Sequence, residues 1–277
     1  MRQVPHLLER LFAALALGAS AVFASVAGAV AADNVCTVLA DASTGAILKQ
    51  EGECDRRVPP ASTFKVPIAL MGYDAGFLKD EHDPKLPFKK GYPDWIESWR
   101  TDTDPAAWME NSVVWYSQQV TQALGMEKFA DYVEAFDYGN ADVSGDKGKD
   151  NGLTRSWLSS SLRISPLEQL DFLAKIVGRK LPVSEHAYEM TEAILTKHDL
   201  SNGWKVLGKT GSGFSVGADG AVDRNRPFGW YVGWATKGDR TVVFARLKEL
   251  SERQKMSPGL GSRDELLKEL PSMLGAL

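Results

Sequence analysis

The sequence has 277 residues, of which 44% are hydrophobic and 25% are charged, and its formal net charge is −4. This length allows one large domain or two closely packed ones, and the composition is that of an ordinary globular protein. A net acidic chain without a clustered basic face is not expected to bind nucleic acid.

Residues 1–31 predict a cleaved secretion signal. Arg2 and Arg10 precede a long uncharged apolar run, and its last residues, Ala29–Ala31, have the small-residue form that a signal peptidase cuts. The run is long enough to span a bilayer, so a membrane anchor is the alternative. The abundance of Gly, Ala and Ser favours cleavage after Ala31. We therefore expect an exported protein, periplasmic or secreted, with no stable membrane anchor.

Two cysteines, Cys36 and Cys54, flank a segment that reads as strand, turn and strand. Such a hairpin brings its ends together, so a Cys36–Cys54 disulfide is expected in an oxidising compartment, with buried free thiols as the alternative. No metal site is expected, because the histidines lack ligand spacing with either cysteine. These histidines are His6, His82, His186 and His198.

The rest of the chain divides into a helical middle and a strand-rich end. A helix is expected to begin near Ser62, with Pro67 early enough to be tolerated. Apolar residues at three- and four-residue steps predict helices over 112–125, 126–136 and 165–178, and a polar, glycine-rich connection occupies 138–152. Runs rich in valine and aromatic residues predict strands over 204–210, 228–236 and 240–250, followed by a closing helix over 262–275 with Ser262 as its N-cap.

This pattern predicts an α/β (α+β) fold in which one sheet is assembled from both ends of the chain. We expect a single domain over 32–277, with its sheet in 32–66 and 202–277 and a mainly helical part in 67–201. A functional cleft is expected where the two parts meet.

The stretch Ser62-Thr63-Phe64-Lys65 sets a hydroxyl and an amine on one face of a helical turn among apolar neighbours. A serine is a weak nucleophile until a base takes its proton. A lysine that is shielded from water has a lowered pKa and can be that base, whereas a lysine that reaches solvent cannot. Backbone N–H groups at the helix start would face the negative charge that develops after attack.

Two other serines match nucleophile patterns less well. Ser144 and Lys147 repeat the spacing, but they lie in the polar connection, where water would keep the lysine charged. Ser215 lies in a G-x-S-x-G sequence, which would need a later histidine, and the last histidine is His198.

Two further motifs complement Ser62. Lys209-Thr210-Gly211 follows a predicted strand, where a cation and a donor suit a substrate carboxylate. Ser112-Val113-Val114 offers a second hydroxyl that could relay a proton. S-x-x-K and K-T-G belong to the set of the class A β-lactamases and penicillin-binding proteins, but Val114 stands where that set has an asparagine.

With valine rather than asparagine at position 114, the chain resembles the class D β-lactamases, the oxacillinases, over essentially its whole mature length. The ordered motifs that carry the resemblance are Ser62–Lys65, Ser112–Val114, Tyr138–Asn140, Trp157-Leu158 and Lys209–Gly211. The resemblance implies the fold shared by β-lactamases and penicillin-binding transpeptidases. It also implies a small-molecule β-lactam substrate of the penicillin or oxacillin type.

The resemblance further implies a role for each matching residue. Ser62 would be acylated, and Lys65 would take up carbon dioxide, from CO2 or bicarbonate, to become N6-carboxylysine and act as general base. No separate cofactor is implied. Trp157 would donate to that group, and Ser112 would relay a proton to the leaving nitrogen. The N–H groups of Ser62 and Ser212 would form the oxyanion hole. The substrate carboxylate would be bound by Lys209, Thr210, Gly211 and Arg263. Val114 and Leu158 would supply apolar surroundings. Tyr138–Asn140 reads as a structural turn.

Three alternatives remain at this stage. A β-lactam sensor would acylate without turnover and would need transmembrane helices. A D,D-peptidase shares Ser-x-x-Lys and K-T-G but usually has an asparagine where Val114 stands. A lipase-like esterase would use Ser215. The sequence leaves the oligomeric state open.

Overall fold

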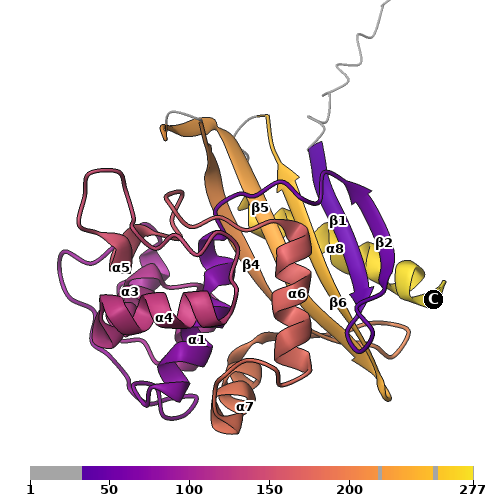
Figure 1. Ribbon diagram of the computed structural model, residues 1–277, viewed down its shortest axis with the longest axis horizontal. Coiled ribbons are helices and arrows are strands. Elements are labelled where there is room, and N and C mark those ends of the chain that lie inside the picture. The colour runs from indigo at the N-terminus through magenta and orange to yellow at the C-terminus, as the bar shows by residue number, and fades with distance from the viewer. Residues whose placement is uncertain (1–32, 218–219, 252–254, 277) are drawn as a thin grey trace, which may run out of the picture. The chain divides into compact units, whose positions relative to one another are not determined.

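The computed structural model describes residues 33–217, 220–251 and 255–276 (Figure 1). The predicted secretion signal in 1–31 therefore lies outside the described residues. In the described part of the chain, no helix combines the length and apolar character that a membrane crossing requires.

One antiparallel sheet of six strands is assembled from both ends of the described chain, as predicted, in the order β2-β1-β6-β5-β4-β3. The strands are β1 (Asp33–Asp41), β2 (Ile47–Gly52), β3 (Thr196–Asp199), β4 (Lys205–Val216), β5 (Val222–Lys237) and β6 (Arg240–Glu249). β3 is a short strand at the end of 67–201, the part that was predicted to be mainly helical. This four-residue strand is too short to show a two-residue periodicity, and its pairing with β4 creates it.

Helices fill the region between β2 and β3, and the three helices predicted there by spacing are confirmed as α3, α4 and α6. This region holds the short 3-10 helices η1 (Ala61–Phe64) and η2 (Glu97–Trp99), and the α-helices α1 (Lys65–Asp74), α2 (Pro105–Asn111), α3 (Val114–Leu124), α4 (Met126–Ala135), α5 (Gly152–Arg155), α6 (Pro166–Val177) and α7 (Glu185–Ile194). The last helix, α8 (Pro258–Gly275), follows β6. α6 begins with a complete capping box between Ser165 and Glu168.

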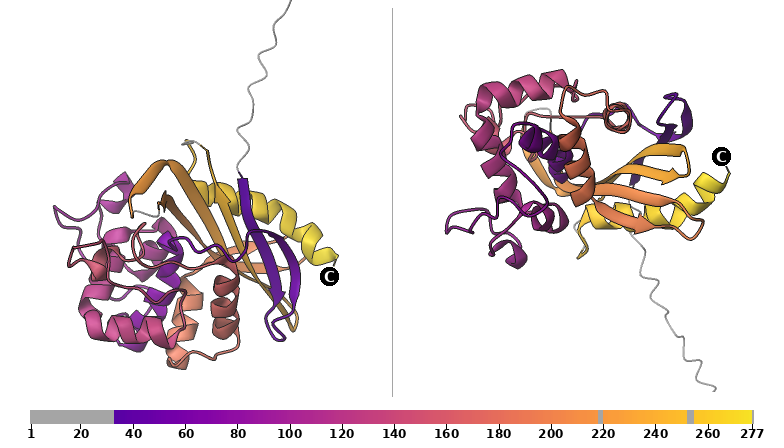
Figure 2. Two further views of the ribbon diagram at one scale, coloured as in Figure 1. Left: turned by 45° about the horizontal axis from the view of Figure 1, so that its top comes forward. Right: turned by 90° about the horizontal axis from the view of Figure 1, so that it is seen from below.

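Both faces of the central strands are buried, so these strands read as continuous apolar runs. Successive side chains of a strand point to opposite faces. On β6, Val243 and Ala245 join the main core with α1 and α6, whereas Val242 and Phe244 pack against α8. Figures 1 and 2 show α8 running along the face of the sheet opposite α6.

The closing helix begins earlier than predicted, at Pro258 rather than Ser262. Ser262 lies inside α8, where its buried hydroxyl donates to the Gly229 carbonyl oxygen at 2.9 Å. Glycines are poor helix formers, so Gly259 and Gly261 hid this first turn, although Ser257-Pro258 is itself a helix-start signal. Gly229 allows the approach, because a Cβ there would lie 2.2 Å from the backbone of Pro258.

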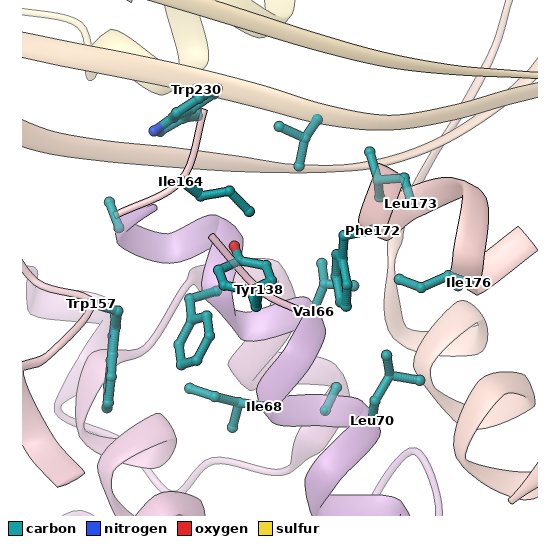
Figure 3. Packing of buried hydrophobic residues seen from close by; sticks show 14 of the residues in the cluster. Val66, Ile68, Leu70, Tyr138, Trp157, Ile164, Phe172, Leu173, Ile176 and Trp230 are labelled. Carbon is teal, nitrogen blue, oxygen red and sulfur yellow. The ribbon is translucent and has the colours of Figure 1, made fainter. Parts of the chain in front are cut away.

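Helix α1 is buried along nearly its whole length. Figure 3 shows Ile68 and Leu70 on α1 facing the same core as Leu173 and Ile176 of α6. A helix that is apolar on all sides belongs in a protein interior. Its first residue, Lys65, is therefore held in hydrocarbon surroundings.

The predicted disulfide is confirmed: Cys36 on β1 and Cys54 after β2 are joined, and the described cysteines include no free thiol. Both side chains are buried in the main core. The bond closes the loop that contains the hairpin turn. In the chain-entropy account, such a bond stabilises the protein by restricting the unfolded chain.

We expect replacement of both cysteines by alanine to lower the free energy of unfolding by about 3 kcal/mol, as a closed loop of this size implies. Guanidinium titrations of the oxidised wild type and the double variant measure this difference. The reduced wild type serves as the control and should approach the variant. Equal midpoints for the oxidised protein and the variant would contradict the prediction.

Candidate active site

Ser62 and Lys65 lie side by side where η1 passes into α1. The Lys65 Nζ lies 3.2 Å from the Ser62 Oγ. Ser62 is half-buried, whereas Lys65 is 0% exposed. Burial, reinforced by the charge of Lys209, holds the pKa of the Lys65 amine well below its usual range. The expected desolvated amine next to a reachable hydroxyl is therefore present in the fold.

The turn before Ser62 is fixed by contacts to distant parts of the chain. The Trp230 indole donates to the Pro59 carbonyl oxygen at 3.0 Å, and the Ala61 N–H donates to the Trp157 carbonyl oxygen at 3.1 Å. Ala61 itself has a φ of +50°, an unusual conformation for alanine. Such strain persists only where the surroundings impose it, and here the contacts of Pro59 and Ala61 hold the turn that carries Ser62.

Trp157 forms part of an aromatic wall beside this turn. Its ring centroid lies 5.7 Å from that of Phe64 and 6.4 Å from that of Phe129. The indole Nε1 is buried and has no hydrogen-bond partner among the described residues. An indole can only donate, and buried donors are normally paired. This corner of the site therefore fits a polar acceptor.

Ser112 and Lys209 meet on the other side of the site. The Lys209 Nζ donates to the Ser112 Oγ at 3.1 Å and to the Thr210 carbonyl oxygen at 3.3 Å. Ser112 ends α2 in the left-handed conformation, with φ +56°, so it joins α2 to α3 rather than heading a helix. Burial and the charge of Arg263 lower the pKa of Lys209 to about 7.

Neither Lys65 nor Lys209 has a described carboxylate within 4.0 Å. Charged groups that are removed from water need partners or lose their charge. Without a carboxylate partner, the two buried amines are therefore driven toward their neutral forms.

The Lys209–Ser212 segment of β4 is an open sheet edge. β3 pairs only with Lys205–Gly208, so β4 faces η1 from Lys209 onward. A Cβ on Gly211 would lie 2.9 Å from the Pro60 carbonyl oxygen and 3.0 Å from Thr63 Cγ2. The glycine of K-T-G thus lets this strand approach the Ser62 turn, which no local sequence pattern could have indicated.

A cavity of about 400 Å³ opens above Ser62. It brings together the predicted residues Ser62, Ser112, Val114, Leu158, Thr210, Gly211 and Ser212. Lys65, which is fully buried, is not among the residues that line this cavity. Sequence reasoning missed the other lining residues, Trp95, Ile96, Trp99, Glu110, Asn111, Ser257 and Leu260. The apolar side chains of Trp95 and Ile96 are 64% and 51% exposed, which is unusual for large apolar residues. This exposure cannot be seen in the sequence.

Arg263 lies on α8 and is not among the residues that line this cavity. Its guanidinium pairs with the carboxylate of its neighbour Asp264, with Nη2 2.7 Å from Oδ1. Its charge still acts on the site, since it contributes to the lowered pKa of Lys209.

The remaining motifs have structural surroundings. Tyr138 is buried against Phe64, with its hydroxyl accepting from the Gln169 amide at 3.3 Å, and Asn140 donates to the Ser161 carbonyl oxygen at 2.9 Å. Asn140 thus fastens this turn to the segment that follows Trp157. Ser215 lies within β4 and donates to Glu249 at 2.8 Å.

Comparisons with known proteins agree with this architecture. The family model of the penicillin-binding protein transpeptidase domain matches residues 35–271. The chain is 48% identical over 251 residues to β-lactamase OXA-9 of Klebsiella pneumoniae, covering 89% of this chain and 92% of that protein. It is 42% identical over 213 residues to β-lactamase OXA-1 of Escherichia coli, covering 76% and 74% of the two chains.

A solved structure of the class D β-lactamase OXA-427 is 47% identical and superposes with a TM-score of 0.83, covering 87% of this chain and 98% of that one. Sequence relatives and fold therefore point to one group. The chain belongs to the class D serine β-lactamases.

Proposed function

We propose that this protein hydrolyses β-lactams of the penicillin and oxacillin type through an acyl-enzyme on Ser62, with N-carboxylated Lys65 as the general base. The observation that carries the proposal is the fully buried Lys65 Nζ at 3.2 Å from the Ser62 Oγ. A β-lactam substrate is in keeping with the β-lactamases to which the chain is similar.

Two features of the site fit a carboxyl group on Lys65. Only a neutral amine captures carbon dioxide, and burial favours the neutral form of this lysine. The unpaired Trp157 indole N–H beside the aromatic wall would hold an oxygen of the added group. When present, that group supplies a base whose oxygens can accept the proton of the Ser62 hydroxyl.

In the acylation step, the Ser62 Oγ attacks the lactam carbonyl carbon and the C–N bond of the four-membered ring breaks. The N–H groups of Ser62 and Ser212 would stabilise the negative charge on the carbonyl oxygen. Ser112, held by Lys209 at 3.1 Å, would pass a proton to the leaving nitrogen. Lys209 and Thr210 would bind the substrate carboxylate, with Arg263 adding positive charge.

In the deacylation step, a water molecule attacks the ester carbonyl carbon. The bond from that carbon to the Ser62 Oγ breaks, the serine regains its proton and the opened acid leaves. Val114 and Leu158 line the cavity and would limit the number of waters that reach the base. We also propose that the protein acts after export, with residues 1–31 removed, and that it needs no separate cofactor.

Replacement of Ser62 by alanine is expected to abolish hydrolysis of a chromogenic cephalosporin, because the attacking oxygen is gone. Replacement of Lys65 by alanine is expected to lower turnover at least 1,000-fold and to leave a covalent adduct, seen by intact-protein mass spectrometry. Ser144→Ala, in the second Ser-x-x-Lys sequence, is the matched control and should keep normal activity. Full activity of Ser62→Ala would disprove the assignment, and acylation of the wild type without turnover would instead indicate a sensor.

Activity is expected to fall as the pH is lowered and to be restored by bicarbonate. As the pH falls through the lowered pKa of Lys65, the amine takes up a proton and can no longer bind carbon dioxide. Added bicarbonate raises the dissolved carbon dioxide and draws the remaining neutral amine into the carboxylated form. Initial rates at fixed low pH across a bicarbonate series measure this, with sodium chloride of equal ionic strength as the control. A flat response would count against the carboxylated lysine.

Trp157→Phe is expected to reduce kcat about 10- to 100-fold and to increase the bicarbonate concentration needed for half-maximal activity. The variant keeps the aromatic wall but removes the N–H that would hold the carboxyl group. Trp204→Phe, on the far face of the sheet against α8, is the control and should keep the wild-type bicarbonate response. The same bicarbonate dependence in Trp157→Phe and wild type would show that the indole has no part in holding the group.

A further inference from the structure

A second cavity, of about 470 Å³, adjoins the cavity of Ser62. The two share Trp95, Leu158 and Ser212, and the second one also includes Ala61, next to the nucleophile. Its other lining residues are Arg155, Ser159, Gly213, Phe214, Val222 and Arg224. None of these was assigned a role by the sequence motifs. We call this second cavity the arginine pocket.

The arginine pocket lies at the end of the site that faces away from the carboxylate-binding residues. Along β4, Thr210 and Ser212 line the Ser62 cavity, and Ser212, Gly213 and Phe214 line the arginine pocket. Thr210 and Phe214 are about 13 Å apart along an extended strand, which is the scale of a penicillin molecule. In a penicillin, the ring carboxylate and the acylamino side chain extend in opposite directions. With the carboxylate at Thr210, the side chain reaches toward Phe214.

Two guanidinium groups give the pocket its charge. The Arg224 guanidinium lies 5.7 Å from the centroid of the Phe214 ring, and no described carboxylate lies within 4.0 Å of it. The Arg155 Nε contacts the Asp146 carboxylate at 3.3 Å, and its Nη2 donates to the Leu158 carbonyl oxygen at 3.3 Å. Asp146 therefore pairs with only one of the two cations, and the pocket keeps a net positive charge.

The other walls are aromatic and aliphatic. Phe214, Leu158 and Val222 border the space, and the exposed Trp95 ring stands at its boundary with the Ser62 cavity. Such walls accept an aryl group by burial of apolar surface, while the guanidinium groups bind a carboxylate through charge-assisted hydrogen bonds. The pocket thus combines the features needed for a side chain that carries both.

We propose that the arginine pocket binds the acylamino side chain of the substrate and selects β-lactams whose side chain carries an aryl group together with an anionic group. Arg224 and Arg155 are the residues that determine this specificity. The inference rests on the proposed β-lactamase function and adds to it a substrate class. A side chain with an ammonium group in the same place is disfavoured, because it meets two cations.

Three penicillins that differ only at the side-chain α-carbon provide the test: benzylpenicillin, α-carboxybenzylpenicillin and α-aminobenzylpenicillin. We expect kcat/KM for the α-carboxy compound to exceed that for the α-amino compound. Arg224→Gln and Arg155→Gln should each lower that ratio about three- to tenfold, as expected for partly exposed charge pairs, and leave benzylpenicillin within about twofold. The wild-type ratio should also fall as sodium chloride is raised, because salt screens exposed charges.

Two further variants exclude trivial causes. Arg240→Gln removes the same charge at the far end of the sheet, where β6 begins, and should leave the ratio unchanged. Arg155→Lys keeps the charge next to Asp146, and should retain most of the wild-type ratio even if Arg155→Gln disturbs the loop.

An unchanged ratio in both glutamine variants, or an equal fall in Arg240→Gln, would overturn the proposal while the β-lactamase function remained, because benzylpenicillin would still be hydrolysed. Absence of hydrolysis of all three penicillins by the wild type would overturn the proposed function, and the substrate selection with it.

Discussion

The site depends on one constraint: an amine must lie next to a hydroxyl in a place that water does not reach. Lys65 meets this constraint because it begins a helix that is buried on every side, with its Nζ 3.2 Å from the Ser62 Oγ. The desolvation that lowers its pKa also makes the charged form costly. In the proposed mechanism, burial of α1 therefore serves the chemistry as well as stability.

The meeting of the sheet and the helical region builds the rest of the site around that amine. η1 supplies Ser62, the junction of α2 and α3 supplies Ser112, and β4 supplies Lys209 at a sheet edge that β3 leaves open. Contacts from Trp230 and Trp157 fix the turn that carries Ser62. Each of these candidate site residues thus comes from a different element, and the shared core holds them at fixed separations.

Positive charge lies at both ends of the site. Lys209 and Arg263 make the end near α8 basic, and Arg155 and Arg224 make the opposite end basic. The apolar surface of Leu158 and Trp95 lies between the two ends and is shared by both cavities. A substrate with anions at both ends and an uncharged, strained amide in the middle matches this arrangement. In the proposed mechanism, one end binds the common part of the substrate and the other distinguishes its side chain.

The sequence by itself determined the local pieces. The strand, turn and strand pattern predicted the hairpin, and helical spacing predicted α3, α4 and α6. The Ser62–Lys65 spacing predicted their contact. These signals depend only on near neighbours along the chain. β3 and the first turn of α8 escaped prediction, since a four-residue strand exists only through its partner and two glycines conceal a helix start. Tertiary structure alone decided that Lys65 is fully shielded from water. It also decided that Gly211 lets β4 reach the Ser62 turn and that Arg155 and Arg224 line one cavity. Burial and proximity depend on residues far apart in the chain, which a linear pattern does not record.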